Sequence, residues 1–295
     1  MKDPLPLWRS LLYVPANRSR FVEKARSTGA DAIQLDLEDS IAPGEKDAAR
    51  LLVRDAAATL ADVADVIVRI NRPLSLAVRD IEAVVCPQVT AISLPKVEGP
   101  EQVRLLAEVV AEAEVRTGMT LGATRLIVGI ESAAGWLRMH EIATAHERIV
   151  AMLLGSEDFS QSVGMAASPE ALHGPKQAMV IAAAAAGILP LGLVGSFANY
   201  RDVDAFAAMI ERSVDLGFQG ATCIHPDQVA ALNDGFSPRP AAIADARKVV
   251  AAFDQAVAAG QGAVGLEGRM LDLPVVERAR ATLARAARLP VAATG

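Results

Sequence analysis

A short apolar run that recurs eight times constrains the fold of this chain more than any other feature. Each run is rich in valine, isoleucine and leucine, and each is followed by an amphipathic or alanine-rich stretch. The runs occupy residues 11–14, 32–37, 66–70, 91–94, 126–130, 149–154, 191–194 and 221–224. Runs that do not alternate with polar residues are typical of strands buried on both faces of a parallel sheet.

Helical spacing of apolar residues occurs between the runs, as at residues 101–116 and 200–216. Eight strand–helix units of roughly 30 residues each predict an α/β protein, a (β/α)8 TIM barrel. An open doubly wound sheet is the alternative. Its dinucleotide-binding version is disfavoured, because no Gly-x-Gly-x-x-Gly turn follows the first strand.

The repeat ends near Phe236, so we expect a catalytic TIM-barrel domain at residues 1–236. Pro238 and Pro240 then break the chain, and a helix at 241–259, a glycine-rich turn at 260–268 and a last helix from Val275 follow. We interpret residues 237–295 as a C-terminal helical appendage. It is expected to dock on the barrel or on a neighbouring subunit.

Composition excludes several classes of protein. The 295 residues include 29 basic and 35 acidic side chains, and a net charge of −6 disfavours nucleic-acid binding. Residues 178–199 carry no charge, but Gly187 and Pro190 interrupt them, which favours a buried helix and strand over a membrane span. Two distant cysteines, Cys86 and Cys223, and the lack of an apolar signal core near the N-terminus predict a cytoplasmic protein without disulfides.

Polar residues lie at the ends of several of the predicted strands or just beyond them, where a TIM barrel carries its functional groups. They are Asp36, Glu38, Asp39, Arg69, Lys96, Glu131, Asp158 and His225. Glu131 and Asp158 end adjacent predicted strands, and strands that pair lie about 4.8 Å apart. Two carboxylates without a histidine or cysteine nearby suit a hard cation such as Mg²⁺, and the alternative is that each pairs with an arginine or caps a helix.

Arg69 interrupts a strand of valine and isoleucine, and a guanidinium at a barrel mouth can hold a substrate carboxylate through two hydrogen bonds. Alternatively it forms a structural ion pair with Asp36 or Glu38, and both roles can coexist. Lys96 is interpreted as an electrostatic or structural lysine in preference to a Schiff-base nucleophile. His225 is expected to orient loops through hydrogen bonds and not to bind metal.

Three cations, Arg18, Arg20 and Lys24, lie at the start of the first predicted helix, where the helix dipole disfavours positive charge. They become favourable if an anion such as a diphosphate binds there. The alternative is a solvated basic surface.

The chain resembles the citrate lyase beta-subunit family, which includes malyl-CoA and citramalyl-CoA lyases within the HpcH/HpaI-type aldolases. The matching stretches are RSLLYVP at 9–15, DLEDS at 36–40, RIN at 69–71, ISLPK at 92–96, IESAAG at 130–135, GSEDF at 155–159, IHPDQ at 224–228 and GRMLDLP at 268–274. They run in order over nearly the whole chain. Ala16, Glu267 and the stretch 160–164 depart from common forms of the family.

The resemblance implies a magnesium-containing barrel in which Glu131 and Asp158 are the metal ligands and Arg69 holds the substrate carboxylate. It further implies that Asp272 reaches a neighbouring subunit's active site from the C-terminal extension. A homotrimer, or a pair of trimers, is therefore expected.

The resemblance also implies an activity: a carbon–carbon lyase that cleaves or forms a 3-hydroxyacyl-CoA such as citramalyl-CoA or malyl-CoA. The products of cleavage would be acetyl-CoA and a 2-oxo acid, pyruvate or glyoxylate. Asp272 is the expected acid that protonates the departing enolate carbon. Arg18, Arg20 and Lys24 would then contact the CoA phosphates.

Three other functions stay open at this point. The chain could be a citrate lyase beta subunit whose substrate arrives on an acyl-carrier protein. It could be a non-catalytic module that binds CoA esters or oxo acids. It could also be a metal-dependent aldolase that acts on free hydroxy-oxo acids.

Overall fold

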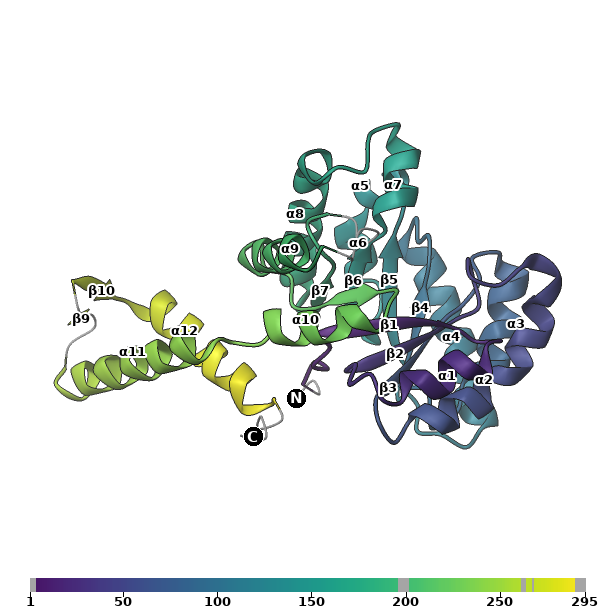
Figure 1. Cartoon of the computed structure of the whole chain (residues 1–295), viewed down its shortest axis with the longest axis horizontal. Coiled ribbons are helices and arrows are strands. Elements are labelled where there is room, and N and C mark those ends of the chain that lie inside the picture. The colour runs from purple at the N-terminus through teal and green to yellow at the C-terminus, as the bar shows by residue number, and fades with distance from the viewer. Residues whose placement is uncertain (1–3, 196–201, 261–263, 267, 290–295) are drawn as a thin grey trace. The chain divides into compact units, whose positions relative to one another are not determined.

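The computed structural model describes residues 4–195, 202–260, 264–266 and 268–289. The chain divides into two compact units, Met1–Phe236 and Ser237–Gly295. In Figure 1 the second unit carries the labels α11, β9, β10 and α12.

The first unit is built on one eight-stranded sheet in which all paired strands are parallel. Its strands are β1 (Ser10–Pro15), β2 (Ala32–Asp36), β3 (Asp65–Arg69), β4 (Ala91–Leu94), β5 (Arg125–Ile130), β6 (Ile149–Leu154), β7 (Leu189–Leu191) and β8 (Ala221–Cys223). The order is β7-β6-β5-β4-β3-β2-β1-β8, so the chain winds around the sheet one strand at a time. The predicted TIM-barrel fold is confirmed.

The barrel closes between β7 and β8 through a narrow contact. Leu191 and Gly220 form a parallel bridge, and the N–H of Gly192 donates to the carbonyl oxygen of Gly220 over 2.8 Å. A Cβ atom at Gly220 would lie 1.7 Å from the carbonyl oxygen of Trp8. Glycine is therefore required where the last strand packs against the start of the first.

The helices of the first unit surround the sheet (Figure 1). They are α1 (Ser19–Ala25), α2 (Lys46–Leu60), α3 (Leu74–Val84), α4 (Pro100–Arg116), α5 (Ala133–Leu137), α6 (Met139–Ala143), α7 (Ser156–Val163), α8 (Pro169–Ala186), α9 (Val203–Asp215) and α10 (Asp227–Gly235), with a short 3-10 helix at Pro43–Glu45.

Two apolar clusters explain why the strands have no polar face. A large cluster that includes Val68 and Val128 lies between the strands and the helices, whereas Leu11, Ile67 and Ile127 belong to a smaller one inside the barrel. Because alternate residues of a strand point to opposite faces, the two clusters together produce continuous apolar runs.

The seventh strand differs from the sequence-based expectation. It covers Leu189–Leu191 and not 191–194, because Gly192 adopts a φ of 148° directly after it and turns the chain. The uncharged stretch forms the end of α8 and then β7, interrupted at Gly187 as expected, while its residues 196–199 lie outside the described part of the chain. The predicted helix 200–216 is α9 from Val203, and residues 200–201 also lie outside the description.

The second unit contains α11 (Pro240–Ala258) and α12 (Leu273–Ala287). Its apolar core includes Val249 and Phe253 of α11, Val276 of α12 and Leu271, which precedes α12. Residues 264–266 of the glycine-rich turn expected at 260–268 form the strand β9 (Val264–Leu266), which pairs antiparallel with β10 (Arg269–Leu271). The prediction of a turn was wrong for residues 264–266, and its residues 261–263 and 267 lie outside the described part of the chain.

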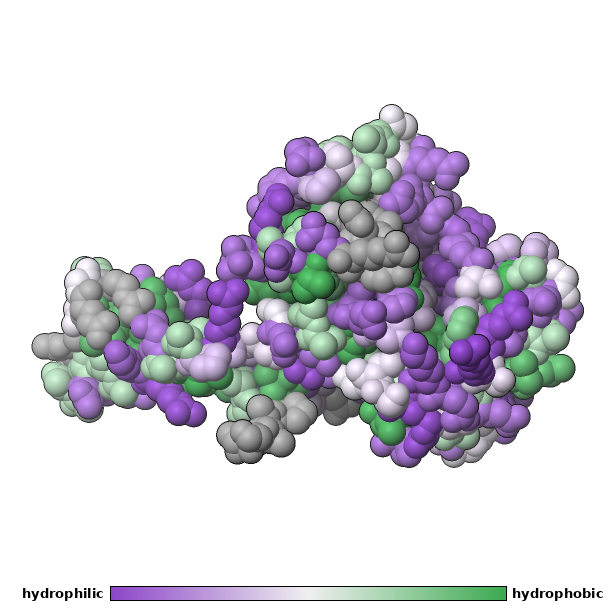
Figure 2. Space-filling view, viewed as in Figure 1, coloured by the Kyte–Doolittle hydropathy of each residue, from purple (hydrophilic) through white to green (hydrophobic). Residues whose placement is uncertain are grey.

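Among the described residues, no helix is both long and apolar enough to cross a membrane. Hydrophilic side chains cover much of the face in Figure 2, with apolar side chains scattered among them. Cys86 and Cys223 are both buried, free thiols.

Candidate functional site

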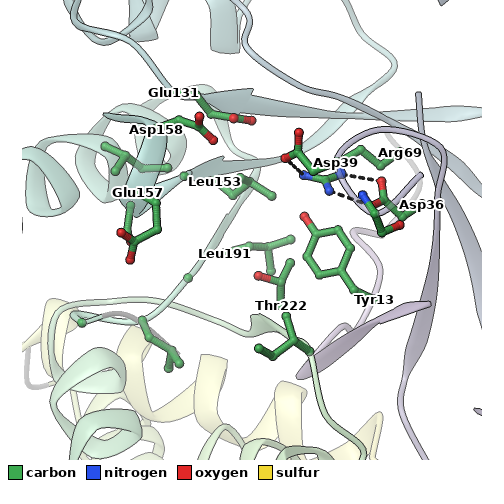
Figure 3. A pocket seen from close by; sticks show the side chains of 18 of the residues that line it. Tyr13, Asp36, Asp39, Arg69, Glu131, Leu153, Glu157, Asp158, Leu191 and Thr222 are labelled. Carbon is green, nitrogen blue, oxygen red and sulfur yellow. Dashed lines mark hydrogen bonds and ion pairs between the residues drawn. The ribbon is translucent and has the colours of Figure 1, made fainter. Parts of the chain in front are cut away.

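A cavity of about 460 Å³ lies at the mouth of the barrel, and most of the residues that line it lie at or just beyond the C-terminal ends of the strands. Its charged lining residues, where the structure describes them, are Asp36, Asp39, Arg69, Glu131, Glu157, Asp158 and Lys176. Figure 3 shows Glu131 and Asp158 close together on one side and Arg69, Asp36 and Tyr13 on another. Side chains from separate parts of the sequence therefore meet where the fold predicts a functional site.

Glu131 directly follows β5, and only 7% of its surface is exposed. The backbone N–H of Lys96 donates to its Oε1 over 3.3 Å. Burial raises the pKa of Glu131 to about 7, and the negative charges of Glu38 and Asp158 add to this shift. Asp158 lies in the first turn of α7, which begins directly after β6 and Gly155.

Two glycines leave the space that the Glu131 side chain occupies. A Cβ atom at Gly155 would lie 2.8 Å from Cγ of Glu131, and one at Gly129 would lie 2.9 Å from its Oε1. Real Cβ atoms do not approach other atoms so closely. The two glycines are therefore part of the site, although sequence analysis did not select them.

This arrangement fits a divalent cation. Five carboxylates and two cations line the described cavity, so their charges sum to −3 when all are ionised. The pair of Glu131 and Asp158 offers oxygen ligands, which Mg²⁺ prefers, and a cation beside them would offset the repulsion that raises the Glu131 pKa. No group of three or more Asp, Glu, His or Cys residues with metal-binding geometry occurs in the described residues, so water or substrate would supply the other ligands.

Arg69 ends β3 and pairs with carboxylates at the end of β2 and directly after it. Its Nε and Nη2 donate to the two oxygens of Asp36 over 2.7 and 2.8 Å. Nη1 lies 3.0 Å from Glu38 Oε2 and 3.4 Å from Asp39 Oδ2. Burial of Asp36 acts to raise its pKa, but Arg69 outweighs this and holds the pKa of Asp36 below its ordinary value.

The structural ion pair considered for Arg69 is therefore present, and the residue also lines the cavity. The Arg69 guanidinium lies 4.8 Å from the ring centre of Tyr13, a cation–π contact that adds to its positioning. Burial raises the pKa of Tyr13 to about 12, so its hydroxyl stays protonated at neutral pH.

Lys96 links two parts of the site. Its Nζ donates to Glu38 over 2.9 Å and lies 3.6 Å from Asp39, while its backbone N–H contacts Glu131. A φ of 51° places Lys96 in the left-handed region, which few non-glycine residues adopt and which is frequent at functional sites. The electrostatic and structural interpretation of this lysine agrees with these contacts.

The remaining candidate residues are not among the residues that line the described cavity. Arg18, Arg20 and Lys24 are exposed at the start of α1 and on it, and none of them lines the described cavity. Nδ1 of His225 accepts from the backbone N–H of Asp227 over 3.3 Å, next to Ile224, which does line the cavity.

Asp272 belongs to the second unit, where its exposed carboxylate caps α12 by accepting from the N–H of Val275 over 3.3 Å. The cap accounts for a carboxylate at this position within one chain. The expected reach into a neighbouring subunit stays a prediction.

Sequence analysis missed Tyr13, Glu157 and Lys176 as cavity residues. A signal for Lys176 was present, because it shares a helical stripe with the buried residues Leu172, Met179 and Ala183. A lysine on the buried face of a helix is uncommon and marks a functional candidate. Tyr13 gave a weaker signal, since aromatic residues are frequent in strands.

Comparison with known proteins places this site in a family. The family model for HpcH/HpaI aldolase/citrate lyase matches residues 9–226. The chain belongs to this family. The match covers β1 to β8 and therefore includes every strand that lines the cavity.

Several relatives of the chain are named as carbon–carbon lyases. The citrate lyase subunit beta of Leuconostoc mesenteroides subsp. cremoris is 34% identical over 278 residues, which are 93% of this chain and 91% of that protein. The L-malyl-CoA/beta-methylmalyl-CoA lyase of Rhodobacter capsulatus is 33% identical over 96% of each chain. Protein CitE of Mycobacterium tuberculosis, solved with magnesium, acetoacetate and coenzyme A, is 29% identical, has a TM-score of 0.75, and covers 98% of this chain and 100% of its own.

Proposed function

We propose that this chain is a magnesium-dependent carbon–carbon lyase acting on a 3-hydroxyacyl-CoA such as citramalyl-CoA or malyl-CoA. In the cleavage direction the products are acetyl-CoA and a 2-oxo acid. The observation that carries the proposal is the pair formed by the buried Glu131 and the partly buried Asp158 in the cavity that Arg69 also lines. The relatives named as malyl-CoA lyase and citrate lyase subunit beta support it.

Glu131 and Asp158 are the residues that would hold the magnesium ion. When bound, such an ion polarises the oxygens it contacts and lowers the pKa of a hydroxyl group. Lys96 keeps Glu131 in place through its backbone N–H, and Gly129 and Gly155 leave room for the carboxylate. These contacts orient the Glu131 carboxylate before substrate arrives.

Arg69 is the proposed binding group for the substrate carboxylate. Asp36 fixes the guanidinium through two hydrogen bonds, and the Tyr13 ring supports it, so little side-chain freedom is lost on binding. The guanidinium also offsets the charge of the carboxylate next to the reacting carbon.

Cleavage removes the proton of the substrate hydroxyl and breaks the bond between the hydroxyl-bearing carbon and the carbon beside the thioester. The electron pair of that bond passes to the thioester as an enolate, and a proton then adds to its carbon to give acetyl-CoA. The carboxylates that line the cavity are candidates to accept the first proton. We propose Asp272 of a neighbouring subunit as the donor of the second.

A shared active site requires a homo-oligomer, and we propose a trimer or a pair of trimers. The exposure of the Asp272 carboxylate and the separate core of its unit are compatible with such a role. We further propose that Arg18, Arg20 and Lys24 contact the phosphates of CoA, which would give these exposed cations an anionic partner. The free thiols Cys86 and Cys223 suit a reducing compartment, and we propose the cytoplasm.

The test is release of pyruvate from citramalyl-CoA and of glyoxylate from malyl-CoA by the purified protein, with magnesium and with EDTA. We expect release that requires magnesium, and the faster ester identifies the substrate. No release from either intact ester by folded, magnesium-loaded protein would refute the proposal.

A second function is favoured by the similarity to citrate lyase subunit beta. In that case the substrate would be a thioester of an acyl-carrier protein, and the isolated chain would be nearly inactive on CoA esters. Assaying acyl-carrier thioesters beside the CoA esters separates the two functions.

A further inference from the structure

Lys176 is a buried cation in the cavity that the proposed mechanism does not use. It lies on α8 with 2% of its surface exposed, and it lines the same cavity as Arg69 and Glu131. Its ammonium group donates to the carbonyl oxygens of Leu193 over 2.5 Å and of Gly195 over 3.0 Å. These two bonds hold the group just beyond the end of β7.

Among the described residues, the groups that accept hydrogen bonds from Lys176 are neutral carbonyls, with no carboxylate among them. Burial lowers the pKa of Lys176 to about 8, and the charge of Glu157 opposes this only in part. A buried charge without a charged partner destabilises a folded protein, whereas a buried methionine of similar length would not. An anionic ligand in the cavity would give the ammonium group a charged acceptor in addition to the carbonyls of the described residues.

The strand order places Lys176 opposite Arg69. In the closed eight-stranded barrel β3 and β7 are four strands apart, so they stand across the barrel from one another. β5, which positions Glu131, is two strands from each. A ligand held at Glu131 and Asp158 therefore has Arg69 on one side and Lys176 on the other.

The cavity wall at the ends of β6, β7 and β8 contains the apolar residues Leu153, Leu191, Leu193 and Ile224. Glu157 also lines the cavity, and its charge acts on Lys176. A substrate whose carboxylate faces Arg69 directs its thioester carbon away from that residue, toward this wall. Cleavage places negative charge on the thioester oxygen, and a fixed cation in an apolar wall stabilises such charge strongly.

We propose that the Lys176 ammonium group is a catalytic group that hydrogen-bonds the thioester oxygen and stabilises the enolate. The inference rests on the proposed lyase function. In the step concerned, the carbon–carbon bond breaks, its electron pair forms the enolate, and the hydroxyl proton passes to a carboxylate of the cavity as the 2-oxo acid forms. Lys176 gives up no proton in this step, because its ammonium group remains a hydrogen-bond donor throughout.

The test measures enolate formation separately from bond cleavage. Acetyl-CoA is incubated in D2O with the full-length protein, Mg²⁺ and oxamate, an unreactive isostere of pyruvate, and deuteration of its methyl group is followed by mass spectrometry. Removing one oxyanion donor typically costs about 100- to 1,000-fold in rate. We expect that loss for Lys176→Met and a smaller loss for Lys176→Arg, with oxamate affinity unchanged in both.

Gln177→Met is the matched control, because Gln177 is the exposed neighbour of Lys176 on the same helix. It should exchange at the wild-type rate. The inference is overturned if Lys176→Met exchanges within about threefold of wild type. The inference is also overturned if Lys176→Met lowers the affinity for oxamate together with the rate of deuterium exchange. Lys176 would then have a structural role. If the wild-type protein neither exchanges nor cleaves, the lyase function itself fails and the inference fails with it.

Discussion

At the scale of single residues, the described lining of the cavity contains more carboxylates than cations. This imbalance explains why buried carboxyl groups in it differ in pKa. Glu131 is buried beside Asp158 and Glu38, so its ionised form is disfavoured and its pKa is raised to about 7. Asp36 is also buried, yet the bidentate bond to Arg69 lowers its pKa. The pKa values of Asp36 and Glu131 therefore shift in opposite directions. Asp36 is paired with Arg69, whereas Glu131 lies beside two other carboxylates.

The raised pKa of Glu131 predicts a pH dependence of stability in the metal-free protein. A carboxyl whose pKa is higher in the folded state stabilises that state below its unfolded pKa of 4.5, and the contribution is lost as pH rises through about 7. The shift corresponds to about 3 kcal/mol. In EDTA, the free energy of unfolding measured with denaturant should fall more from pH 5 to pH 8 for wild type than for Glu131→Gln. An equal fall in the two proteins would contradict the assignment of this pH dependence to Glu131. Mg²⁺ should restore stability at pH 8 only in wild type.

The space left by Gly155 predicts a second residue-level effect. In Gly155→Ala the new Cβ would lie 2.8 Å from Cγ of Glu131, so the carboxylate must move. We expect magnesium affinity to fall by about 10- to 100-fold, the usual cost of disturbing a ligand's surroundings. Gly174→Ala, in α8 with open space around its Cβ position, is the control and should bind as wild type does in calorimetry. Unchanged affinity in Gly155→Ala would show that Glu131 does not hold the ion.

The elements of the fold were predicted to differing degrees, for physical reasons. Most strands were predictable because their two faces meet different apolar clusters, which leaves unbroken apolar runs. The position of β7 was predicted incorrectly, because residues 188–194 form one apolar stretch in the sequence. The strand ends where the backbone of Gly192 turns, and the apolar pattern does not show this. The meeting of Arg69 with Asp36 followed from their adjacent strands, whereas the approach of Lys176 from α8 depends on helix packing that the strand pattern does not contain.

At the opposite end of the barrel, α4 is tied to the sheet by a buried ion pair. Glu114 accepts from Arg148 over 2.7 and 2.8 Å and from the N–H groups of Gly122 and Thr124. Removing one partner of a buried pair leaves an uncompensated charge, so Glu114→Ala should lower the free energy of unfolding by about 3–5 kcal/mol.

Urea denaturation measures this loss of stability, and a variant that breaks an exposed ion pair is the control. Glu82→Ala, which removes the half-exposed partner of Arg116, should cost no more than about 1 kcal/mol. Similar losses in the two variants would show that the buried pair does not anchor α4.

For the whole molecule, the proposed sharing of Asp272 between subunits predicts complementation. Arg69→Ala and Asp272→Ala should each be nearly inactive alone. Co-expressed as mixed oligomers, they should recover part of the wild-type activity, because some sites then combine an intact Arg69 with an intact Asp272 from a neighbour. Mixed oligomers without activity would mean that Asp272 does not act across subunits.

The central claim is that Glu131 and Asp158 hold the magnesium ion on which carbon–carbon cleavage depends. The most direct measurement is the rate of 2-oxo acid release from the preferred ester as Mg²⁺ is added to EDTA-stripped wild-type protein and Asp158→Asn. We predict saturable activation of wild type and a Mg²⁺ requirement about 100-fold higher, or no activity, in the variant. Release that proceeds in EDTA, or identical magnesium curves for the two proteins, would contradict the account.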